Sequence, residues 1–252
     1  MLAAERRSLL LARLHRDGKL VARDLAVELG LSEDSLRRDL RELAAAGLCQ
    51  RVYGGALPVS PATGEWATRL GIAAESKRLV ALRAAQLITP GSTVILGGGT
   101  TAHAVVEALP QNLSAMIVTP SPVTAAALVS HPTVDVFVLG GRLLKQAASV
   151  CGAATADAAS KISADLYLLG VAGVHVDEGL TTSDPDEAAM ERFLVGRSAE
   201  TYVLASQDKL GTVAAFSVIG LSEVAGVITD ADAAHPGVRA LRKRKVAVLH
   251  AP

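Results

Sequence analysis

The chain has 252 residues, half of them hydrophobic and 3% aromatic, so Leu, Val, Ile and Ala must fill its core. Lys and Arg together equal Asp and Glu in number, which argues against a nucleic-acid binder coated evenly in positive charge. Cys49 and Cys151 are far apart and in no metal-like spacing, so we expect neither a zinc site nor a disulfide framework, and we predict no metal and no cofactor.

No stretch of the chain is suited to export or to a membrane. The opening residues, MLAAERRSLLLARLHRDG, mix acidic and basic side chains and lack the apolar core of a signal peptide. No segment approaches the roughly 20 apolar residues that cross a bilayer. We therefore expect a soluble protein of the cytoplasm without a membrane partner.

Three short helical patterns open the chain. Their leucines recur three and four residues apart, which is typical of a helix with one buried face, and place helices approximately at residues 4–16, 22–29 and 32–46. Each pattern stops at a glycine, which favours a helix end: Gly18, Gly30 and Gly47. The following LCQRVYGGAL has two short apolar stretches around glycines and predicts a small β-hairpin, or wing.

The third helix has the side chains expected of a DNA-recognition helix. Its leucines hold it to its domain and leave polar and basic residues on the remaining arc, and a tight turn joins it to the helix before it, as in a helix-turn-helix. Arginine is the commonest reader of guanine in the major groove. The alternative is a small helical domain with ordinary surface arginines. The predicted DNA-binding residues of helix and wing are Ser32, Ser35, Arg37, Arg38, Arg41, Arg51, Tyr53 and Gly54.

This region closely resembles the N-terminal domain of the DeoR family of bacterial regulators. The matching residues are Glu5-Arg6-Arg7, Gly18, Leu25-Ala26, Ser32, Leu36-Arg37-Arg38-Asp39-Leu40, Leu43, Gly47-Leu48, Arg51 and Gly54-Gly55-Ala56. The chain departs from the family where Ser35 stands for a usual Thr and Tyr53 for a usual His. The resemblance implies binding to a double-stranded DNA operator.

Residues 57–75 contain two prolines and little periodicity, which is typical of a linker. From residue 76 the chain alternates between short apolar strands and Ala-rich helical patterns, which predicts a parallel sheet covered on both faces. The candidate strands are residues 93–96, 116–119, 134–139, 165–171, 201–205, 224–229 and 246–249.

A glycine-rich turn, GGGTT at residues 97–101, joins the first strand to a helix. Glycines let the backbone approach an anion, and the helix start adds free N–H groups, so Gly98, Gly99, Thr100 and Thr101 are candidates for holding a phosphate. A merely tight turn is the alternative. The next strand ends in Thr119-Pro120-Ser121 without the carboxylate that a dinucleotide site needs, and the turn has no Walker lysine.

Ligands of open α/β sheets bind at the carboxyl ends of the strands, and several polar residues lie at such ends here. Lys209 is a candidate partner for a phosphate, while Lys77 is a candidate whose alternative, a solvated lysine, is favoured. The remaining candidate effector-binding residues are Thr119, Ser121, Gly140, Gly141 and Asp184.

Residues 76–249 resemble the DeoR sensor domain, which is similar in fold to ribose-5-phosphate isomerase. The matching residues are Lys77, Pro90-Gly91-Ser92-Thr93, Gly98-Gly99-Thr100-Thr101, Gly140-Gly141, Gly179-Leu180-Thr181, Asp186-Glu187-Ala188 and Asp208-Lys209-Leu210-Gly211. The chain has Gly97 where the family often has Asp, and Pro120 where it often has Asn. The resemblance implies a phosphorylated sugar or related metabolite as effector.

We therefore predict an α/β protein in three parts: a winged helix-turn-helix at residues 1–57, a linker at 58–75 and a larger, mostly parallel effector-sensing domain at 76–252. The predicted function is a transcriptional regulator, in the family's usual sense a repressor of sugar-metabolism genes. It would act as a homodimer or homotetramer whose DNA-binding domains are rearranged by the effector.

Two alternatives remain at this point. One is a sugar-phosphate isomerase with an extra domain, for which Asp184, Glu187 and Lys209 are the acid–base candidates. The isomerases of this fold carry Asp-Gly-Ala-Asp-Glu and Lys-Gly-Gly-Gly stretches that this chain lacks, so we expect no enzymatic turnover. The other is a DNA-binding scaffold whose sensor has lost its ligand, suggested by Gly97 and Pro120.

Overall fold

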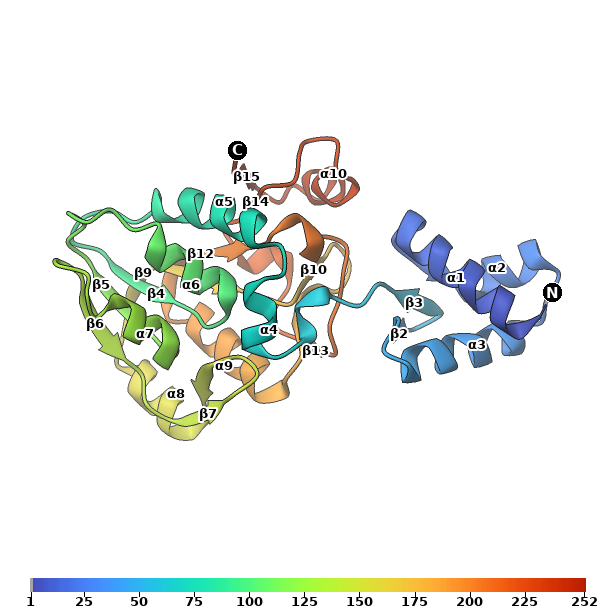
Figure 1. The fold of residues 1–252 in the computed structure, drawn as a ribbon, viewed down its shortest axis with the longest axis horizontal. Helices are drawn as coiled ribbons and strands as arrows, with labels where there is room; N and C mark the ends of the chain where they lie inside the picture. The colour runs from blue at the N-terminus through green and yellow to red at the C-terminus, as the bar shows by residue number, and fades with distance from the viewer. Residues whose placement is uncertain (1) are drawn as a thin grey trace.

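The computed structural model describes residues 2–252, except for the side chains of His15 and Thr63. A small helical domain at the N-terminus and a larger α/β domain lie side by side and are joined after strand β3 (Figure 1). No helix among the described residues combines the length and the hydropathy that crossing a bilayer requires.

The small domain is a winged helix-turn-helix, as predicted. Its helices lie within one or two residues of their expected ranges: α1 (Ala3–Asp17), α2 (Ala22–Leu29) and α3 (Glu33–Ala45). The wing consists of β2 (Gln50–Val52) and β3 (Gly55–Leu57), and a two-residue strand, β1 (Leu20–Val21), pairs antiparallel with β3. Gly18 and Gly30 adopt left-handed conformations at the ends of α1 and α2. Leucines at positions 10, 14, 36 and 40 form the centre of its core.

The segment predicted as a linker packs onto the larger domain. Val59 forms a parallel bridge with Val213, and the Ser60 hydroxyl donates to the Ala172 carbonyl at 2.5 Å. A 3-10 turn, η1 (Pro61–Thr63), and a short helix, α4 (Trp66–Leu70), follow. Prolines and small residues here therefore mark an irregular path over the surface of the sensor domain, which we call the connecting segment (residues 58–75).

The larger domain is built on a seven-stranded parallel sheet of order β15-β14-β12-β9-β4-β5-β6. All seven predicted strands are present: β4 (Thr93–Leu96), β5 (Met116–Thr119), β6 (Asp135–Val138), β9 (Ala164–Gly170), β12 (Ser198–Leu204), β14 (Gly226–Thr229) and β15 (Val248–His250). The chain adds strands outward from β4 and then returns to its other side at β9. The strand order therefore reverses between β4 and β9.

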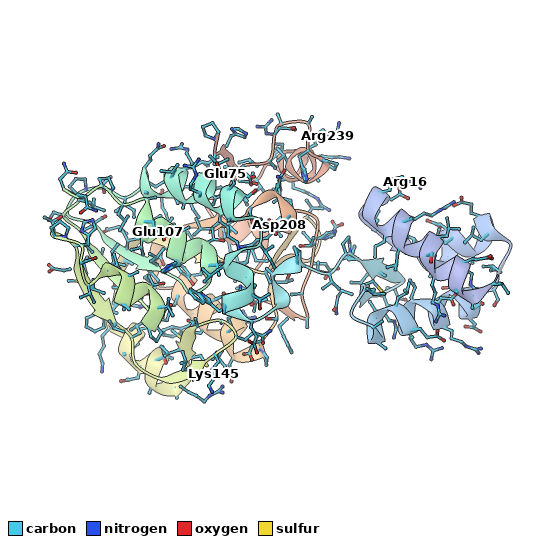
Figure 2. The ribbon with its side chains drawn as sticks, in the orientation of Figure 1. Arg16, Glu75, Glu107, Lys145, Asp208 and Arg239 are labelled. Carbon is cyan, nitrogen blue, oxygen red and sulfur yellow. The ribbon has the colours of Figure 1, made fainter. Side chains whose placement is uncertain are left out.

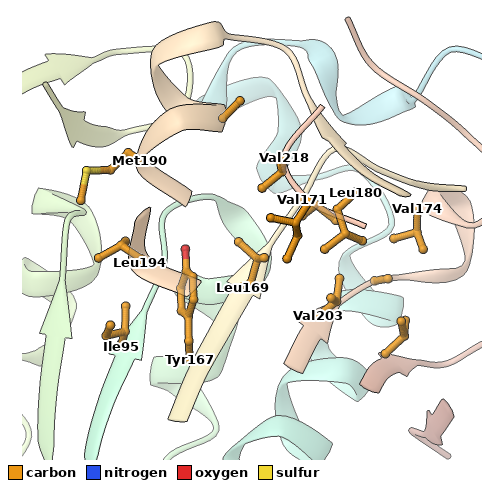
Figure 3. Close-up of a cluster of buried hydrophobic side chains, with 14 of the residues drawn as sticks. Ile95, Tyr167, Leu169, Val171, Val174, Leu180, Met190, Leu194, Val203 and Val218 are labelled. Atoms are coloured by element: carbon orange, nitrogen blue, oxygen red, sulfur yellow. The ribbon is translucent and has the colours of Figure 1, made fainter. Parts of the chain in front are cut away.

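Alternate strand residues supply two cores. On one face, Val94 and Leu96 of β4 pack against α5 (Ala74–Ala85), α6 (Thr100–Glu107) and α7 (Pro122–Leu128). On the other face, Ile95 and Leu169 belong to a cluster with α8 (Ala153–Ser160), α9 (Pro185–Val195) and α10 (Pro236–Lys243), part of which Figure 3 shows. Burial on both faces explains the uninterrupted apolar character of the central strands.

Two antiparallel additions were not predicted. The first is a three-stranded sheet of β10 (Gly173–His175), β11 (Gly179–Thr182) and β13 (Phe216–Ser217), and the second is the hairpin of β7 (Arg142–Leu144) and β8 (Ser149–Cys151). These strands have two to four residues and include glycine, serine and threonine, so neither length nor alternation distinguishes them from loops.

Candidate functional site

A groove runs between α3 and the wing of the small domain. Its lining includes four of the predicted DNA-binding residues, Arg37, Arg51, Tyr53 and Gly54. The groove encloses about 1110 Å³ of empty space, much of it open to solvent. Arg23 of α2 also lines it and was not singled out in the sequence, because it lies outside the helix that carries the recognition pattern.

Buried contacts fix α3 beneath this groove. Arg6 of α1 forms a bidentate ion pair with Asp39 of α3, whose side chain is almost fully buried. Ser32 caps the helix, because its hydroxyl oxygen accepts a hydrogen bond from the Ser35 backbone N–H at 3.2 Å. The helix is therefore held from its inner face and its start, which leaves the outer arc free to meet a ligand.

The basic side chains of the outer arc are exposed. Arg37 is 55% exposed, and its Nη2 lies 2.6 Å from Oε1 of Glu33, one turn earlier. Arg38 and Arg41 are exposed as well but do not line the groove, and Tyr53 at the tip of the wing is fully exposed. An exposed pair such as Glu33–Arg37 contributes little to stability, so the arginine can exchange its partner for a phosphate or a base.

A second site lies in the larger domain, at the carboxyl ends of β4 and β9, where the strand order reverses. Reversal separates the helices on the two sides of the sheet and leaves a crevice that ligands of α/β proteins occupy. Here the crevice is a cavity of about 910 Å³ of empty space, partly open to solvent, which we call the central cavity. In Figure 2, Asp208, one of its lining residues, lies within the body of the domain.

The glycine-rich turn forms one wall of the central cavity. Gly99 has φ +88°, a conformation that favours glycine, and it caps the start of α6. A Cβ atom on Gly98 would lie 2.8 Å from Cβ of Ser149, so this position has no room for a side chain. Thr100 and Thr101 are buried in the first turn of α6 and line the cavity. The backbone N–H groups of this turn are thus presented to the cavity, as an anion site requires.

Four cationic side chains line the same cavity: the exposed Lys145, and Arg69, Lys77 and Lys209, which are at least partly buried. Lys77 and Lys209 are each only 5% exposed. Lys209 Nζ donates to Thr101 Oγ1 at 3.3 Å, and Lys77 Nζ donates to the Arg69 carbonyl. Burial lowers the pKa of both lysines, that of Lys209 to about 8, and also lowers the pKa of Arg69. Asp208 and Glu187 line the cavity as well, and Asp208 partly offsets the effect of burial on the pKa of both lysines.

Asp230, just after β14, positions the two lysines. Its Oδ1 accepts the backbone N–H of Gln207 at 2.8 Å, and its Oδ2 accepts the hydroxyl of Ser76. Gln207 begins the 3-10 turn that carries Lys209, and Ser76 precedes Lys77 on α5. One carboxylate thus joins the two backbone segments from which the lysines project.

Two polar atoms of the cavity lining are buried without a hydrogen-bond partner in the described part of the chain, Arg69 Nε and Asp208 Oδ1. Buried polar groups in native proteins are nearly always satisfied by protein, water or a ligand. The cavity therefore presents both a donor and an acceptor to whatever fills it.

The central cavity collects most of the predicted effector-binding residues but not all. Gly98, Gly99, Thr100, Thr101, Lys77, Asp184 and Lys209 line it. Lys77 is buried, in contrast to the solvated position favoured by the sequence, because the first turn of α5 faces the cavity. The remaining four predicted residues lie outside the cavity lining: Thr119, Ser121, Gly140 and Gly141.

Those four residues have structural contacts instead. Thr119 is fully buried and accepts the Ser121 N–H, and Ser121 caps α7 through the Thr124 N–H. The Gly140 carbonyl accepts the Thr155 hydroxyl at 2.8 Å, and a Cβ on Gly141 would collide with that hydroxyl. The sequence analysis also missed Arg69, because the connecting segment has no periodicity that points to a functional residue.

Both domains of the chain match domains of known proteins. The DeoR-like helix-turn-helix domain matches residues 6–62, and the DeoR C-terminal sensor domain matches residues 72–231. The chain is 33% identical over 233 residues to the HTH-type transcriptional regulator GlpR of Haloferax volcanii, with 91% of each chain covered. It is 31% identical over 217 residues to the glycerol-3-phosphate regulon repressor of Escherichia coli, with 86% of each chain covered. Ribose 5-phosphate isomerase A of Methanocaldococcus jannaschii is a structural match at 18% identity, with a TM-score of 0.39 and coverage of 53% of this chain and 52% of that chain.

A winged helix-turn-helix joined to an α/β domain with a polar cavity defines a DNA-binding regulator with a sensor. The chain belongs to the DeoR family of helix-turn-helix transcriptional regulators. This confirms the resemblance seen in the sequence and the predicted function of a DNA-binding transcriptional regulator. The matches favour that function over an isomerase-like enzyme.

Proposed function

We propose that the chain is a repressor that binds operator DNA through the α3–wing groove and is controlled by a phosphorylated sugar or related metabolite in the central cavity. The observation that supports the effector class most strongly is the buried set of cations beside the glycine-rich start of α6. Among the described residues, Lys77, Lys209 and Arg69 donate hydrogen bonds to carbonyl or hydroxyl oxygens and not to a carboxylate, and a phosphate dianion would supply a directly bound anion.

The connecting segment couples the two sites in this proposal. Residues 58–60 continue directly from wing strand β3 and are tied to Val213 by two backbone hydrogen bonds of 3.0 and 3.1 Å. The next residues, Pro61 and Ala62, together with Arg69, line the central cavity. An effector that shifts this wall therefore pulls on the chain that positions the wing, which is a direct route for coupling between the sites.

We further propose that the central cavity binds its ligand without turnover. Asp184 caps α9 by accepting the N–H groups of Asp186 and Glu187 at 2.8 and 3.0 Å, and Glu187 accepts the hydroxyl of Thr182. Two of the candidate acid–base groups are thus engaged in structural hydrogen bonds. Release of an isomerised product from any pentose or hexose phosphate in a coupled assay would contradict this part of the proposal.

Two copies of the chain are proposed to act together on DNA in the cytoplasm. A helix-turn-helix protein that reads a two-fold symmetric operator presents two recognition helices about 34–36 Å apart, or a multiple of that spacing. Light scattering of the purified protein with and without operator DNA tests this. A monomer in both conditions would contradict it.

The proposed function is tested by fluorescence anisotropy on the DNA upstream of the protein's own gene. We expect salt-sensitive binding that one of a panel of sugar phosphates releases, while the unphosphorylated sugar does not. Release by the unphosphorylated sugar alone would contradict the effector class. Binding that no compound alters would favour a scaffold without a sensed ligand.

A further inference from the structure

A smaller cavity lies beside the central cavity, between the sheet and α9. Its volume is about 10 Å³, room for about one water-sized group, and it shares Gly98, Leu144 and Glu187 with the central cavity. Glu191 of α9 and Tyr167 of β9 lie on its wall. The two cavities are therefore neighbouring compartments, and Glu187 faces both.

One carboxyl oxygen of Glu191, a residue of intermediate exposure, is buried at this compartment without a hydrogen-bond donor. Its Oε2 has no hydrogen-bond partner in the part of the chain that the structure describes. Desolvation by burial is the main cause that raises the pKa of Glu191 well above its ordinary value, and the neighbouring Glu187 raises it further. Buried polar atoms in native proteins are nearly always hydrogen-bonded, so this oxygen calls for a donor from a ligand or from water.

Tyr167 lies on the wall of this compartment, and Gly97 lies beside the Tyr167 ring. In Figure 3 the hydroxyl of Tyr167 points toward the helix that carries Met190 and Leu194. A Cβ on Gly97 would lie 3.6 Å from that hydroxyl oxygen, which is an ordinary contact, and Gly97 does not adopt a left-handed conformation.

We propose that this compartment, the acidic subsite, receives a hydroxyl or amino group of the effector, which donates a hydrogen bond to Glu191. The proposal rests on the proposed function, because the cations of the central cavity must hold the phosphate end of the same molecule. The buried lysines in the central cavity and Glu191 in the acidic subsite then fix the direction of the ligand. They also make Glu191 a specificity-determining residue, since a site built to bond a hydroxyl rejects an analogue that lacks it.

The test measures binding of inorganic phosphate and phosphate esters to the full-length protein by calorimetry. The esters are glycerol 3-phosphate, glucose 6-phosphate, 2-deoxyglucose 6-phosphate and glucosamine 6-phosphate. The variants are Glu191→Leu, which removes the acceptor, and Glu191→Gln, which keeps an acceptor without the charge. Glu107→Leu, at an exposed glutamate on α6, is the matched control.

We expect the native protein and the control to bind at least one ester more tightly than inorganic phosphate. Glu191→Leu is expected to weaken that ester about tenfold while inorganic phosphate changes less than about twofold. If the ligand's donor is a hydroxyl, Glu191→Gln should bind the ester almost as tightly as the native protein. If the donor is an ammonium group, both variants should bind the ester more weakly. If Glu191→Leu does not fold, Glu191→Ala provides the same test, because it removes the same acceptor without placing a branched side chain in the subsite.

Equal affinities of the native protein and Glu191→Leu for every ester would overturn the proposal. So would a native protein that binds no ester better than inorganic phosphate. Failure of the proposed function has a different signature, namely that neither inorganic phosphate nor any ester binds.

Discussion

The α3–wing groove and the central cavity use charge in opposite ways. Arg37 in the groove is more than half exposed and already paired with Glu33, whereas Lys77 and Lys209 in the cavity are almost fully buried. Charge on the surface attracts a polyanion from a distance and is weakened by salt. Charge in the cavity is shielded from salt but costs desolvation until a ligand arrives.

Because of this difference, the groove is suited to attract DNA of any sequence, whereas the cavity is suited to select one ligand. In the proposed function, a solvated arginine exchanges Glu33 for DNA at little cost, so the groove would bind many phosphates and gain sequence preference only from base contacts. The cavity should bind tightly only a ligand that pairs with its buried cations and with its unpartnered polar atoms.

Lys209→Met is expected to have the largest effect on the sensor. Removal of a buried cation that faces the ligand should weaken a bound phosphate ester at least about 30-fold, or about 2 kcal/mol. The melting temperature of the free protein should not fall, because the Lys209 ammonium group donates its hydrogen bond to the Thr101 hydroxyl and not to a carboxylate. Titration calorimetry and thermal unfolding measure the two quantities. Lys145→Met, at an exposed position of the same cavity, is the control, and an equal loss in both variants would contradict the role of burial.

Arg37→Ala tests the groove. If the arginine reads a base, operator binding should weaken by about 1–3 kcal/mol, with effector binding unchanged. Arg38→Ala, at an exposed position outside the groove lining, should lose less. Anisotropy titrations with operator and unrelated DNA separate base reading from phosphate contact. An identical loss for both variants on both DNAs would show that the groove does not define the recognition surface.

The pH dependence of the two sites should differ. The pKa of Lys209 is about 8 in the free protein because of burial, and a bound phosphate should raise it. Effector binding then takes up a proton, so the affinity should fall about tenfold as pH rises from 7 to 9. Operator affinity without effector should stay nearly constant over this range. If effector affinity no longer depends on pH in Lys209→Met, the dependence is due to Lys209. If it still depends on pH in that variant, another group is responsible.

The smallest effect is expected at Glu33. Glu33→Gln releases Arg37 from its 2.6 Å ion pair and removes a negative charge near the phosphates. Because an exposed helical pair contributes about 0.3–0.5 kcal/mol, operator affinity should rise about twofold. Glu42→Gln, whose partner Arg7 lies outside the groove lining, should leave affinity unchanged. A fall in affinity for Glu33→Gln would mean that the pair orients Arg37.

Locally encoded features could be predicted from the sequence. The helices of the small domain follow from leucine spacing and glycine ends, and the central strands follow from continuous apolar runs. The glycine-rich turn, residues 97–101, identified one wall of the central cavity correctly, because the backbone geometry that it needs depends on those residues alone.

Features that depend on distant contacts could not be predicted. Arg69 reaches the cavity because residues 58–60 pair with Val213, more than 150 positions later, and no local pattern records that pairing. Lys77 has the sequence context of a surface lysine, and only the packing of α5 buries it. Conversely, Thr119 and Ser121 lie at a strand end, as expected, but on β5, which is one strand away from the reversal of strand order.

The pairing of Val59 with Val213 determines where a chimera of this protein and another regulator can be joined. An exchange of sensor domains between regulators at residue 75 would leave Pro61 and Arg69 with the wrong partner and open the wall of the cavity. A junction between Leu57 and Pro58 keeps that wall with its own sheet. Chimeras joined there should carry the ligand preference of the donor of residues 58–252, and chimeras joined at 75 should carry neither parent's.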